Sequence, residues 1–506
     1  MIDCSISHVD LHDIVKYEAL SYVWADLKAN KDIKCESEYL HITANLHAAL
    51  KTLRYRSHPR FLLWPKFVAE ERISMTWDAL IPIPRQNWNA LARLLRRPWF
   101  ERVWIVQEAA NAVQALVVNR DKQFPWDLIT RGVEAIFHNN IAGLLSSERI
   151  RGLNTPINIK HIKSGYLAAA EHKLLAALIM TRALEATNKQ DKLFGLLGLV
   201  GKEITSDLNA DYSMSLEDVY RNLALFFLSK TGLRSLSSAC AVPVTHEYQT
   251  PSWVPNWSFF YDTWTRNPHY YTASGRTVPE VSIDHDLLTL KGQFVDAIRG
   301  LGYEREAAQP LYTVPSVEFI WSTMNQEAIQ MVNWLAMAFG EGIQISIIPP
   351  CQQENFLRTL VFNINVDGTE VRPELIPSIL QYIETYQEVL SAETQNRFVE
   401  LATRHRQQPG QMARVGRSLV VLSNSKLFCV TTKGRFGWTP NSAQVEDDVV
   451  LFHGADNPFV VRPLNVGPVK GLGDVVCYQI IGECYVHGIM KGEALQLDQS
   501  QAITLC

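Results

Sequence analysis

A tryptophan and a glutamate four residues apart are the side chains of this sequence best suited to chemistry. Trp104 and Glu108 lie in segment 97–108, where Pro98 fits the first turn of a helix because that position needs no amide hydrogen. On a helix the two side chains share one face, so the indole can shield the carboxylate from water. A shielded carboxylate is a common catalytic group, although a glutamate beside a tryptophan is more often solvated or ion-paired. Glu108 is therefore a candidate catalytic residue, and the alternative is an ordinary solvated or ion-paired side chain.

The elements that would position these residues alternate between short apolar strands and amphipathic helices. Such alternation predicts a parallel α/β sheet covered by helices. The expected strands are 19–23, 61–64 and 115–118, and the expected helices are 45–55 and 88–112, the second broken at Pro98.

Changes in pattern divide the chain into three predicted domains. Residues 1–130 form the α/β domain, 131–410 are mostly helical with short strands near 251–303, and 411–506 form a small antiparallel β domain, a barrel or a sandwich. In the middle region Ser215 and Asp218 read as a capping pair that opens a helix, and strand 287–292 runs into a turn at Gly292. Apolar side chains at near-helical spacing predict a core-facing stripe at Ile320, Met324, Ile329, Val332 and Leu335.

Composition excludes several classes of protein. The chain has 506 residues, 47% of them hydrophobic and 20% charged. Its net charge is −4 and its pI about 6.4, so we expect no overall electrostatic attraction to nucleic acid or to an anionic membrane. No apolar run reaches the length that spans a bilayer, and residues 1–10 lack the pattern of a secretory signal. The eight cysteines show no C-x-x-C pair and read as reduced thiols. These features predict a cytoplasmic protein.

One of these cysteines lies near a histidine in the sequence. Cys484 and His487, three residues apart, have the residue types of a nucleophile with its base or of half a metal site, but no second pair of ligands is visible and core packing is the commoner role. Glycine-rich phosphate loops and the G-x-S-x-G elbow are absent from the sequence. We therefore expect no metal and no bound cofactor.

Three ordered motifs resemble those of one known family. Segment 17–26 reads YEALSYVWAD, segment 45–54 reads NLHAALKTLR, and segment 102–108 reads RVWIVQE. They are similar to the motifs Y-x-A-L-S-Y-x-W-G, N-L-x-x-A-L-x-x-L-R and R-x-W-x-x-Q-E of the fungal heterokaryon-incompatibility (HET) domain family. Further matches at 191–199, 251–258 and 482–490 extend the resemblance over most of the chain.

The resemblance has one large gap. After Leu62, Leu63 and Trp64 the family continues with an aspartate, a C-I-N-Q element, a helix and a strand ending in W-L-G, whereas Pro65 follows here. Ala25 also replaces the family glycine, and no R-L-L strand precedes Tyr17. The HET domain is thus shortened, either naturally or through coding segments missing from the gene model.

The HET family is similar in turn to TIR domains, and this implies an incomplete flavodoxin- or TIR-like parallel sheet at the N-terminus. Some TIR domains cleave NAD with a glutamate that follows a tryptophan by four residues, the spacing of Trp104 and Glu108. An ionised glutamate can stabilise the ribosyl cation that forms when nicotinamide leaves. The resemblance implies an NAD(P) glycohydrolase acting in fungal non-self recognition or cell death, with NAD as substrate. Its substrate-binding residues would be Tyr22, Trp24, Arg102, Trp104 and Gln107, with Tyr22 and Trp24 stacking on a base or on nicotinamide.

Two other functions remain open on the sequence. One is a non-enzymatic signalling protein with a degenerate HET domain, which associates with itself or with a protein partner through its β domain. The other is a HET-like scaffold reused as a cofactor-free enzyme on a small apolar metabolite, since 13 Trp, 17 Tyr and 20 Phe supply ample pocket lining.

Overall fold

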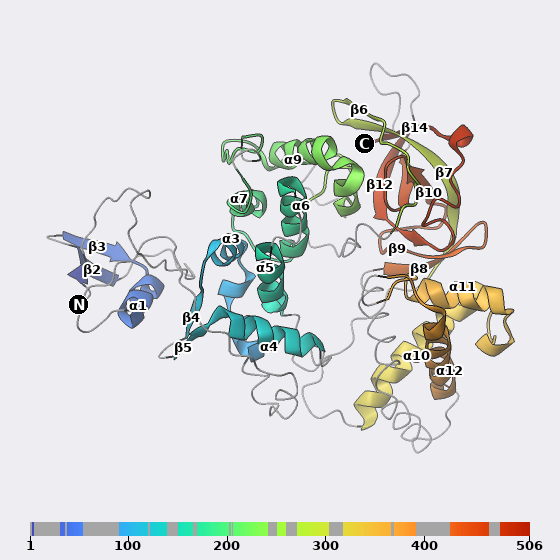
Figure 1. Ribbon diagram of the computed structural model, residues 1–506, viewed down its shortest axis with the longest axis horizontal. Coiled ribbons are helices and arrows are strands. Elements are labelled where there is room, and N and C mark those ends of the chain that lie inside the picture. The colour runs from blue at the N-terminus through green and yellow to red at the C-terminus, as the bar shows by residue number, and fades with distance from the viewer. Residues whose placement is uncertain are drawn as a thin grey trace. The chain divides into compact units, whose positions relative to one another are not determined.

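The computed structural model forms two compact units, Met1–Thr205 and Ser206–Cys506, which we describe separately (Figure 1). Mixed helices and strands build both units, with the largest sheet near the C-terminus. The structure describes residues 3–4, 31–35, 38–53, 91–119, 122–138, 150–164, 169–201, 204, 206–240, 250–259, 271–302, 317–365, 369–390, 426–464 and 476–506.

In the described part of the first unit the strands form two small groups, accompanied by short helices. Strand β2 pairs in parallel with β1 and antiparallel with β3, and β4 forms an antiparallel hairpin with β5. Its elements are β1 (Asp3–Cys4), β2 (Lys31–Cys35), β3 (Glu38–Ile42), α1 (Ala44–Leu53), the 3-10 helix η2 (Pro98–Glu101), α3 (Trp104–Asn111), β4 (Leu116–Asn119), β5 (Lys122–Pro125), α4 (Trp126–His138), η4 (Arg151–Leu153), α5 (Thr155–Lys163), α6 (Ala170–Thr181) and α7 (Asp191–Leu197).

Several expected elements of this unit are present. Helix α1 agrees with the predicted helix 45–55 to within two residues at either end. The break at Pro98 is confirmed, because η2 begins there and α3 follows it. The strand expected at 115–118 is β4, but it pairs antiparallel with β5. The strands expected at 19–23 and 61–64 lie outside the described residues, so the flavodoxin- or TIR-like parallel sheet stays a prediction.

The second unit is built on a sheet that closes on itself. Strand β7 pairs with β10, β10 with β11, β11 with β12, β12 with β14, and β14 with β7 again, so five strands form a ring. All of these pairings are antiparallel except β12 with β14. The elements are α9 (Leu216–Thr231), η5 (Gly232–Ser238), β6 (Val281–Asp284), β7 (Leu287–Leu301), α10 (Val317–Phe339), η6 (Ile345–Ile347), α11 (Pro350–Leu360), η7 (Pro373–Leu375), α12 (Ile376–Leu390), β8 (Lys426–Thr431), β9 (Phe436–Pro440), β10 (Asp448–Phe452), β11 (Phe459–Leu464), β12 (Cys477–Glu483), β13 (Tyr485–Val486), η8 (Leu497–Gln499) and β14 (Gln501–Leu505).

Strand β7 corrects the prediction of a turn at Gly292. The strand continues through Gly292 to Leu301, pairing with β14 over its first part and with β10 and then β8 farther along. A Cβ atom at Gly292 would lie 2.8 Å from the Leu451 carbonyl oxygen of β10, so glycine permits a close approach of two strands here. A strand from the predicted middle domain thus closes the C-terminal sheet, while the division at 130 and 410 remains a prediction.

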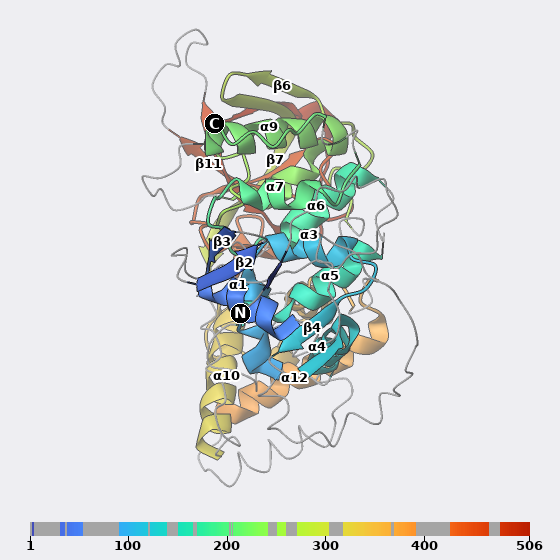
Figure 2. The ribbon, with the colours of Figure 1, turned by 90° about the vertical axis from the view of Figure 1, so that its left-hand side faces the viewer.

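Helices α10, α11 and α12 lie between β7 and β8 in the sequence and pack together beside the strands (Figure 1). Helices α10 and α12 are also adjacent in the turned view (Figure 2). One large core joins them to the sheet. Within residues 328–339 of α10, whose side chains the structure describes, Ala328, Met331, Trp334 and Leu335 are buried.

The predicted apolar stripe of α10 is wrong at Ile329, whose side chain is 47% exposed. Positions 328, 331 and 335 share the face that meets the core, and position 329 is turned by about 100° from that face. Leu335 is buried as predicted, and Val332 is half-buried. The side chains of Ile320 and Met324 lie outside the described residues.

The capping pair of α9 is confirmed. The Asp218 amide donates to the Ser215 hydroxyl at 3.1 Å, and that hydroxyl donates to the Asp218 carboxylate at 2.7 Å. Throughout the described part of the chain, none of the helices combines the length and the apolar character needed to cross a bilayer.

Candidate functional site

The predicted residue Trp104 lies at a contact between α3 and α7. Its indole nitrogen donates to the Asp191 carboxylate at 3.1 Å, and a Cβ atom at Gly195 would lie 3.5 Å from its ring. Asp191 opens α7 and Gly195 lies one turn later, so the two residues present a flat, hydrogen-bonding surface to the indole. Trp104 therefore orients α3 on α7.

Gln107 takes part in the same contact. A Cβ atom at Gly198 would overlap the Gln107 side-chain amide, so the amide occupies the space that glycine leaves. One turn farther along α3, the Asn111 amide nitrogen donates to the Gly198 carbonyl at 2.9 Å. Two stretches that carry the resemblance, 102–108 and 191–199, thus interlock as neighbouring helices.

Arg102 joins this arrangement through its backbone. It forms an isolated parallel bridge with Glu185, and the next amide, that of Val103, donates to the Glu185 carbonyl at 3.0 Å. The buried ammonium of Lys192 donates to the carbonyls of Arg182 and Leu184 on the same loop. The loop between α6 and α7 is thereby fixed against the start of α3.

Glu108 is half-buried on α3, one turn beyond Trp104 and therefore on the same face of the helix. Tyr22 and Trp24 lie outside the described residues. The structure describes the other four residues of the predicted site on or just before α3: Arg102, Trp104, Gln107 and Glu108. Neither of the two best-formed cavities in the described part of the chain is lined by these residues.

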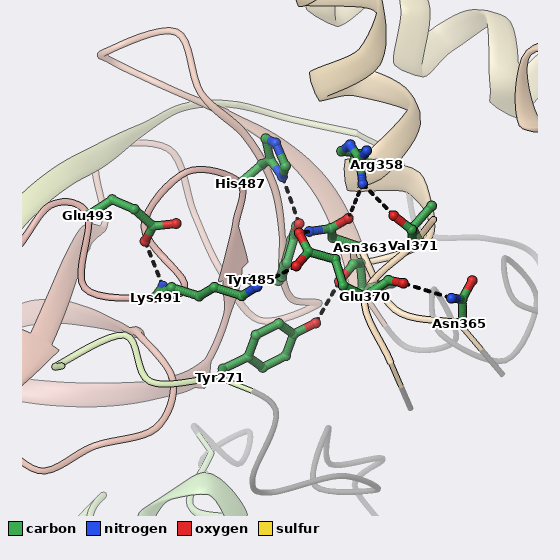
Figure 3. Close-up of polar contacts among 11 residues, drawn as sticks. Tyr271, Arg358, Asn363, Asn365, Glu370, Val371, Tyr485, His487, Lys491 and Glu493 are labelled. Atoms are coloured by element: carbon green, nitrogen blue, oxygen red, sulfur yellow. Dashed lines mark hydrogen bonds and ion pairs between the residues drawn. The ribbon is translucent and has the colours of Figure 1, made fainter. Parts of the chain in front are cut away.

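The larger of those cavities lies in the second unit and has a volume of about 360 Å³. Residues from three separate stretches line it: the segment at 271, the segment from α11 to 370, and the end of β13 with the loop after it. Figure 3 shows the polar contacts among them. The lining residues are Tyr271, Asn355, Arg358, Asn363, Glu370, Tyr485, His487, Gly488, Met490, Lys491 and Glu493.

The turn after α11 has an unusual backbone. Phe362 and Asn363 are successive non-glycine residues with positive φ, 56° and 52°. Each such residue costs about 1 kcal/mol or more and persists only where its surroundings hold it. Here the Asn363 amide donates to the Arg358 carbonyl at 2.7 Å, and the Tyr271 hydroxyl donates to the Phe362 carbonyl at 2.6 Å.

The side chain of Phe362 anchors this turn in the core. It is fully buried and stacks on Trp438 of β9, with ring centroids 5.4 Å apart and planes inclined by 17°. The Trp438 indole nitrogen donates to the Thr359 carbonyl at 2.8 Å, so both the ring and the nitrogen of Trp438 hold the end of α11. The wall of the cavity is therefore rigidly attached to the sheet.

Charged side chains then connect the wall of the cavity to the loop after β13. The Arg358 guanidinium, 14% exposed, donates to the Asn363 side chain and to the Val371 carbonyl, each at 2.8 Å, and pairs with Glu354. Glu370 accepts from Asn363 at 2.9 Å and from the Lys491 ammonium at 2.6 Å (Figure 3). These bonds, that of Lys491 first, lower the pKa of Glu370 below its ordinary value.

His487 also faces this cavity, beside a tyrosine. The Tyr485 hydroxyl and the His487 Nδ1 atom are 2.9 Å apart and share one hydrogen bond. Burial, and then the charge of Arg358, lower the pKa of His487, which keeps the imidazole neutral at pH 7.

Cys484, the partner that the sequence offered for His487, is buried in the core, and its burial raises the pKa of its thiol well above the ordinary value. A thiol kept protonated is a poor nucleophile, so core packing describes Cys484 better than catalysis. Among the described residues, no group of three or more histidine, cysteine, aspartate or glutamate side chains is placed to hold a metal ion.

Sequence reasoning missed most residues of this cavity. Arg358 and Glu370 lie in ordinary polar segments of one stretch of the chain, and Lys491 is separated from Glu370 by 121 positions. The pair Cys484 and His487 lies near the cavity, and His487 lines it, but the sequence indicated this pair as a nucleophile with its base or as half a metal site.

Comparisons with known proteins match two parts of the chain. Residues 17–69 match the family described as heterokaryon incompatibility protein (HET), and residues 381–505 match the Het-6 β-barrel domain. The barrel match covers β8 to β14 but not β7, the strand that closes the ring.

One relative resembles most of the chain. Heterokaryon incompatibility protein 6, OR allele, of Neurospora crassa is 23% identical over 461 residues. The alignment covers 80% of this chain, which spans 66% of the length of that relative. No solved structure shows significant similarity. The chain therefore carries a short segment similar to the HET family and a C-terminal segment similar to the Het-6 barrel, and most of it is similar to one fungal heterokaryon incompatibility protein.

Proposed function

We propose that this chain acts in fungal non-self recognition, with the barrel unit as the recognition module and the HET segment as the part that signals. The observation that carries the proposal is the cavity of the second unit, where the strained turn after α11 and the loop after β13 meet in one fixed network. A rigid polar cavity of this size suits recognition of a small ligand or of one part of a partner. The relative's name, heterokaryon incompatibility protein, supports the same role.

Cell fusion tests this role. The full chain is expressed in a fungal strain that lacks it, the strain is fused with a panel of wild isolates, and dead fusion cells are counted by dye uptake. We expect death with a subset of the isolates, and less death for Lys491→Gln, which removes the ion pair with Glu370. Equal survival with every isolate, at the level of an empty vector, would reject the role.

Glu280→Gln is the matched control for this experiment. It breaks a similarly exposed Lys–Glu pair, Lys291 with Glu280 at 2.8 Å, in the same unit but away from the cavity. Death at the wild-type level is expected for this variant. A loss equal to that of Lys491→Gln would show a general effect of charge or stability.

A second candidate function is NAD(P) glycohydrolysis by a TIR-like first unit, as a step toward cell death in the cytoplasm. Its support is the half-buried Glu108 on the same helix face as Trp104, with Asp191 fixing the indole. In this proposal Glu108 stabilises the ribosyl cation as nicotinamide leaves, while Tyr22, Trp24, Arg102 and Gln107 bind the substrate.

Release of nicotinamide from NAD by the purified chain tests the second candidate. Glu108→Ala and Glu108→Gln are expected to lower the rate by about a hundredfold or more, since the charge acts only in the transition state. Glu101→Gln is the control and should keep the wild-type rate, because Glu101 is also half-buried but lies on η2, seven positions before Glu108. Release no faster than in buffer, or equal rates in the Glu108 variants, would exclude the enzyme.

A further inference from the structure

We propose that the cavity of the second unit binds a small zwitterion, a molecule with one ammonium and one carboxylate group such as a free amino acid. The inference names a ligand class for the recognition role proposed above and rests on that role. It follows from the charges, the size and the rigidity of the cavity, which we take in turn.

The charges that line the cavity are balanced. Arg358 and Lys491 supply two positive groups, and Glu370 and Glu493 supply two negative ones. A polyanion such as a nucleotide would meet two carboxylates, and a polycation would meet the guanidinium and the ammonium. A ligand that carries one charge of each sign meets an opposite charge at both of its ends.

The charged groups also come from opposite sides of the cavity. Arg358 and Glu370 belong to the inserted helical segment, whereas Lys491 and Glu493 belong to the loop after β13 (Figure 3). The Lys491 ammonium already pairs with Glu370, and the Glu493 carboxylate accepts from the Lys491 amide at 2.6 Å. A ligand carboxylate can join Glu370 around this ammonium, and a ligand ammonium can contact the Glu493 carboxylate, which keeps a second oxygen besides the one that accepts from the Lys491 amide.

His487 leaves this balance unchanged. Because burial lowers its pKa, the imidazole adds no third positive charge at pH 7. Its Nδ1 atom is fixed by Tyr485, which orients the ring toward the cavity as one neutral donor or acceptor. His487 and Tyr485 thus add polar groups but no charge to the four charged side chains of the cavity.

Size and rigidity agree with a small ligand. The volume of about 360 Å³ lies near the lower end for small-molecule sites, and a folded partner could not enter it. The turn at Phe362 and Asn363 is held by Arg358, Tyr271 and Trp438, so the cavity is formed before any ligand arrives.

Calorimetric titration of the full chain with each standard amino acid tests the proposal. We expect at least one to bind, and we expect its methyl ester and its N-acetyl derivative each to bind at least about tenfold more weakly, since each lacks one charge. Lys491→Gln and Glu493→Gln should weaken binding by about the same factor. Glu280→Gln, the matched ion-pair control, should bind as the wild type does.

Three results would overturn the inference: no amino acid binds, the capped derivatives bind as well as the parent, or glucose or inorganic phosphate binds more tightly than any amino acid. These results are distinguishable from failure of the proposed function. Fusion-dependent death that persists without amino-acid binding rejects the ligand class alone, whereas amino-acid binding without any death rejects the role in non-self recognition.

Discussion

Two regions of this chain hold side chains suited to chemistry, and the structure uses them differently. On α3, the Trp104 indole donates a hydrogen bond to Asp191 of α7, and the Gln107 amide packs against Gly198 at the end of α7. In the second unit, charged groups from separated segments meet around a half-open cavity. The first region has the clearer sequence motif, and the second has the better-formed cavity.

The difference shows what a motif measures. Helical spacing places Trp104 and Glu108 on one face but does not say which neighbour that face meets. A motif residue can therefore serve the contact between two motif-bearing helices as well as a substrate. The residues of the cavity show no motif because their relation is spatial.

The largest expected effect lies at the anchor of the cavity. Phe362→Ala removes a fully buried ring that stacks on Trp438, so we expect a loss of about 3–5 kcal/mol in the free energy of unfolding of the second unit. Denaturant titration followed by tryptophan fluorescence measures it. Phe259→Ala, at a ring 40% exposed, should cost less than about 0.5 kcal/mol. Equal costs would mean that the turn is not anchored as described.

A buried carboxylate on β7 should give the next largest effect. Asp296 accepts hydrogen bonds from Thr432 at 2.8 Å, from the Lys433 amide at 3.1 Å and from Arg435 at 2.8 Å. Burial alone raises the pKa of Asp296, but hydrogen bonds from Thr431 and then from Thr432, Lys433 and Arg435 outweigh it, and the pKa is lowered. Asp296→Asn should therefore cost about 2–3 kcal/mol at neutral pH.

The lowered pKa also fixes a pH dependence. Since the folded state holds the proton less tightly than the unfolded chain, the contribution of Asp296 is complete above the unfolded pKa of about 3.9 and is lost as the pH falls through the folded value. Unfolding measured between about pH 6 and about pH 3 should show a flatter profile for Asp296→Asn than for the wild type. Identical profiles would contradict the assignment.

For the contact between α3 and α7 we expect a smaller loss of stability, which a second substitution should partly reverse. Gly198→Ala places a methyl group where the Gln107 amide lies, and we expect it to destabilise the first unit by about 1–2 kcal/mol. Adding Gln107→Ala should restore part of that loss, because it clears the space. Thermal unfolding of the single and double variants gives the coupling. Additive costs would separate the two residues and weaken the case for an interlocked pair of motifs.

The smallest effect is expected for the ion pair at the cavity. Lys491 is 42% exposed and Glu370 52%, so solvent screens their attraction, and Lys491→Gln should change stability by less than about 1 kcal/mol. A large loss in the thermal midpoint would show that Lys491 holds the loop after β13 in place.

Local elements of the fold were predictable from the sequence. The cap at Ser215, the break at Pro98 and helix α1 were all found because their signals act within a few residues. Strand β7 was truncated in the prediction, because a glycine inside a strand and a glycine in a turn look alike until the neighbouring strand is known.

The candidate site divides in the same way. The sequence alone determined that Trp104 and Glu108 share a helix face, that the chain carries HET motifs in order, and that strands end it. Only the tertiary structure decided that the face meets Asp191 and Gly198, that β7 closes the C-terminal ring, and that Lys491 meets Glu370 across 121 positions. Capping and periodicity act between residues one turn apart, whereas a closed sheet and a cavity depend on contacts among distant segments, which no local pattern encodes.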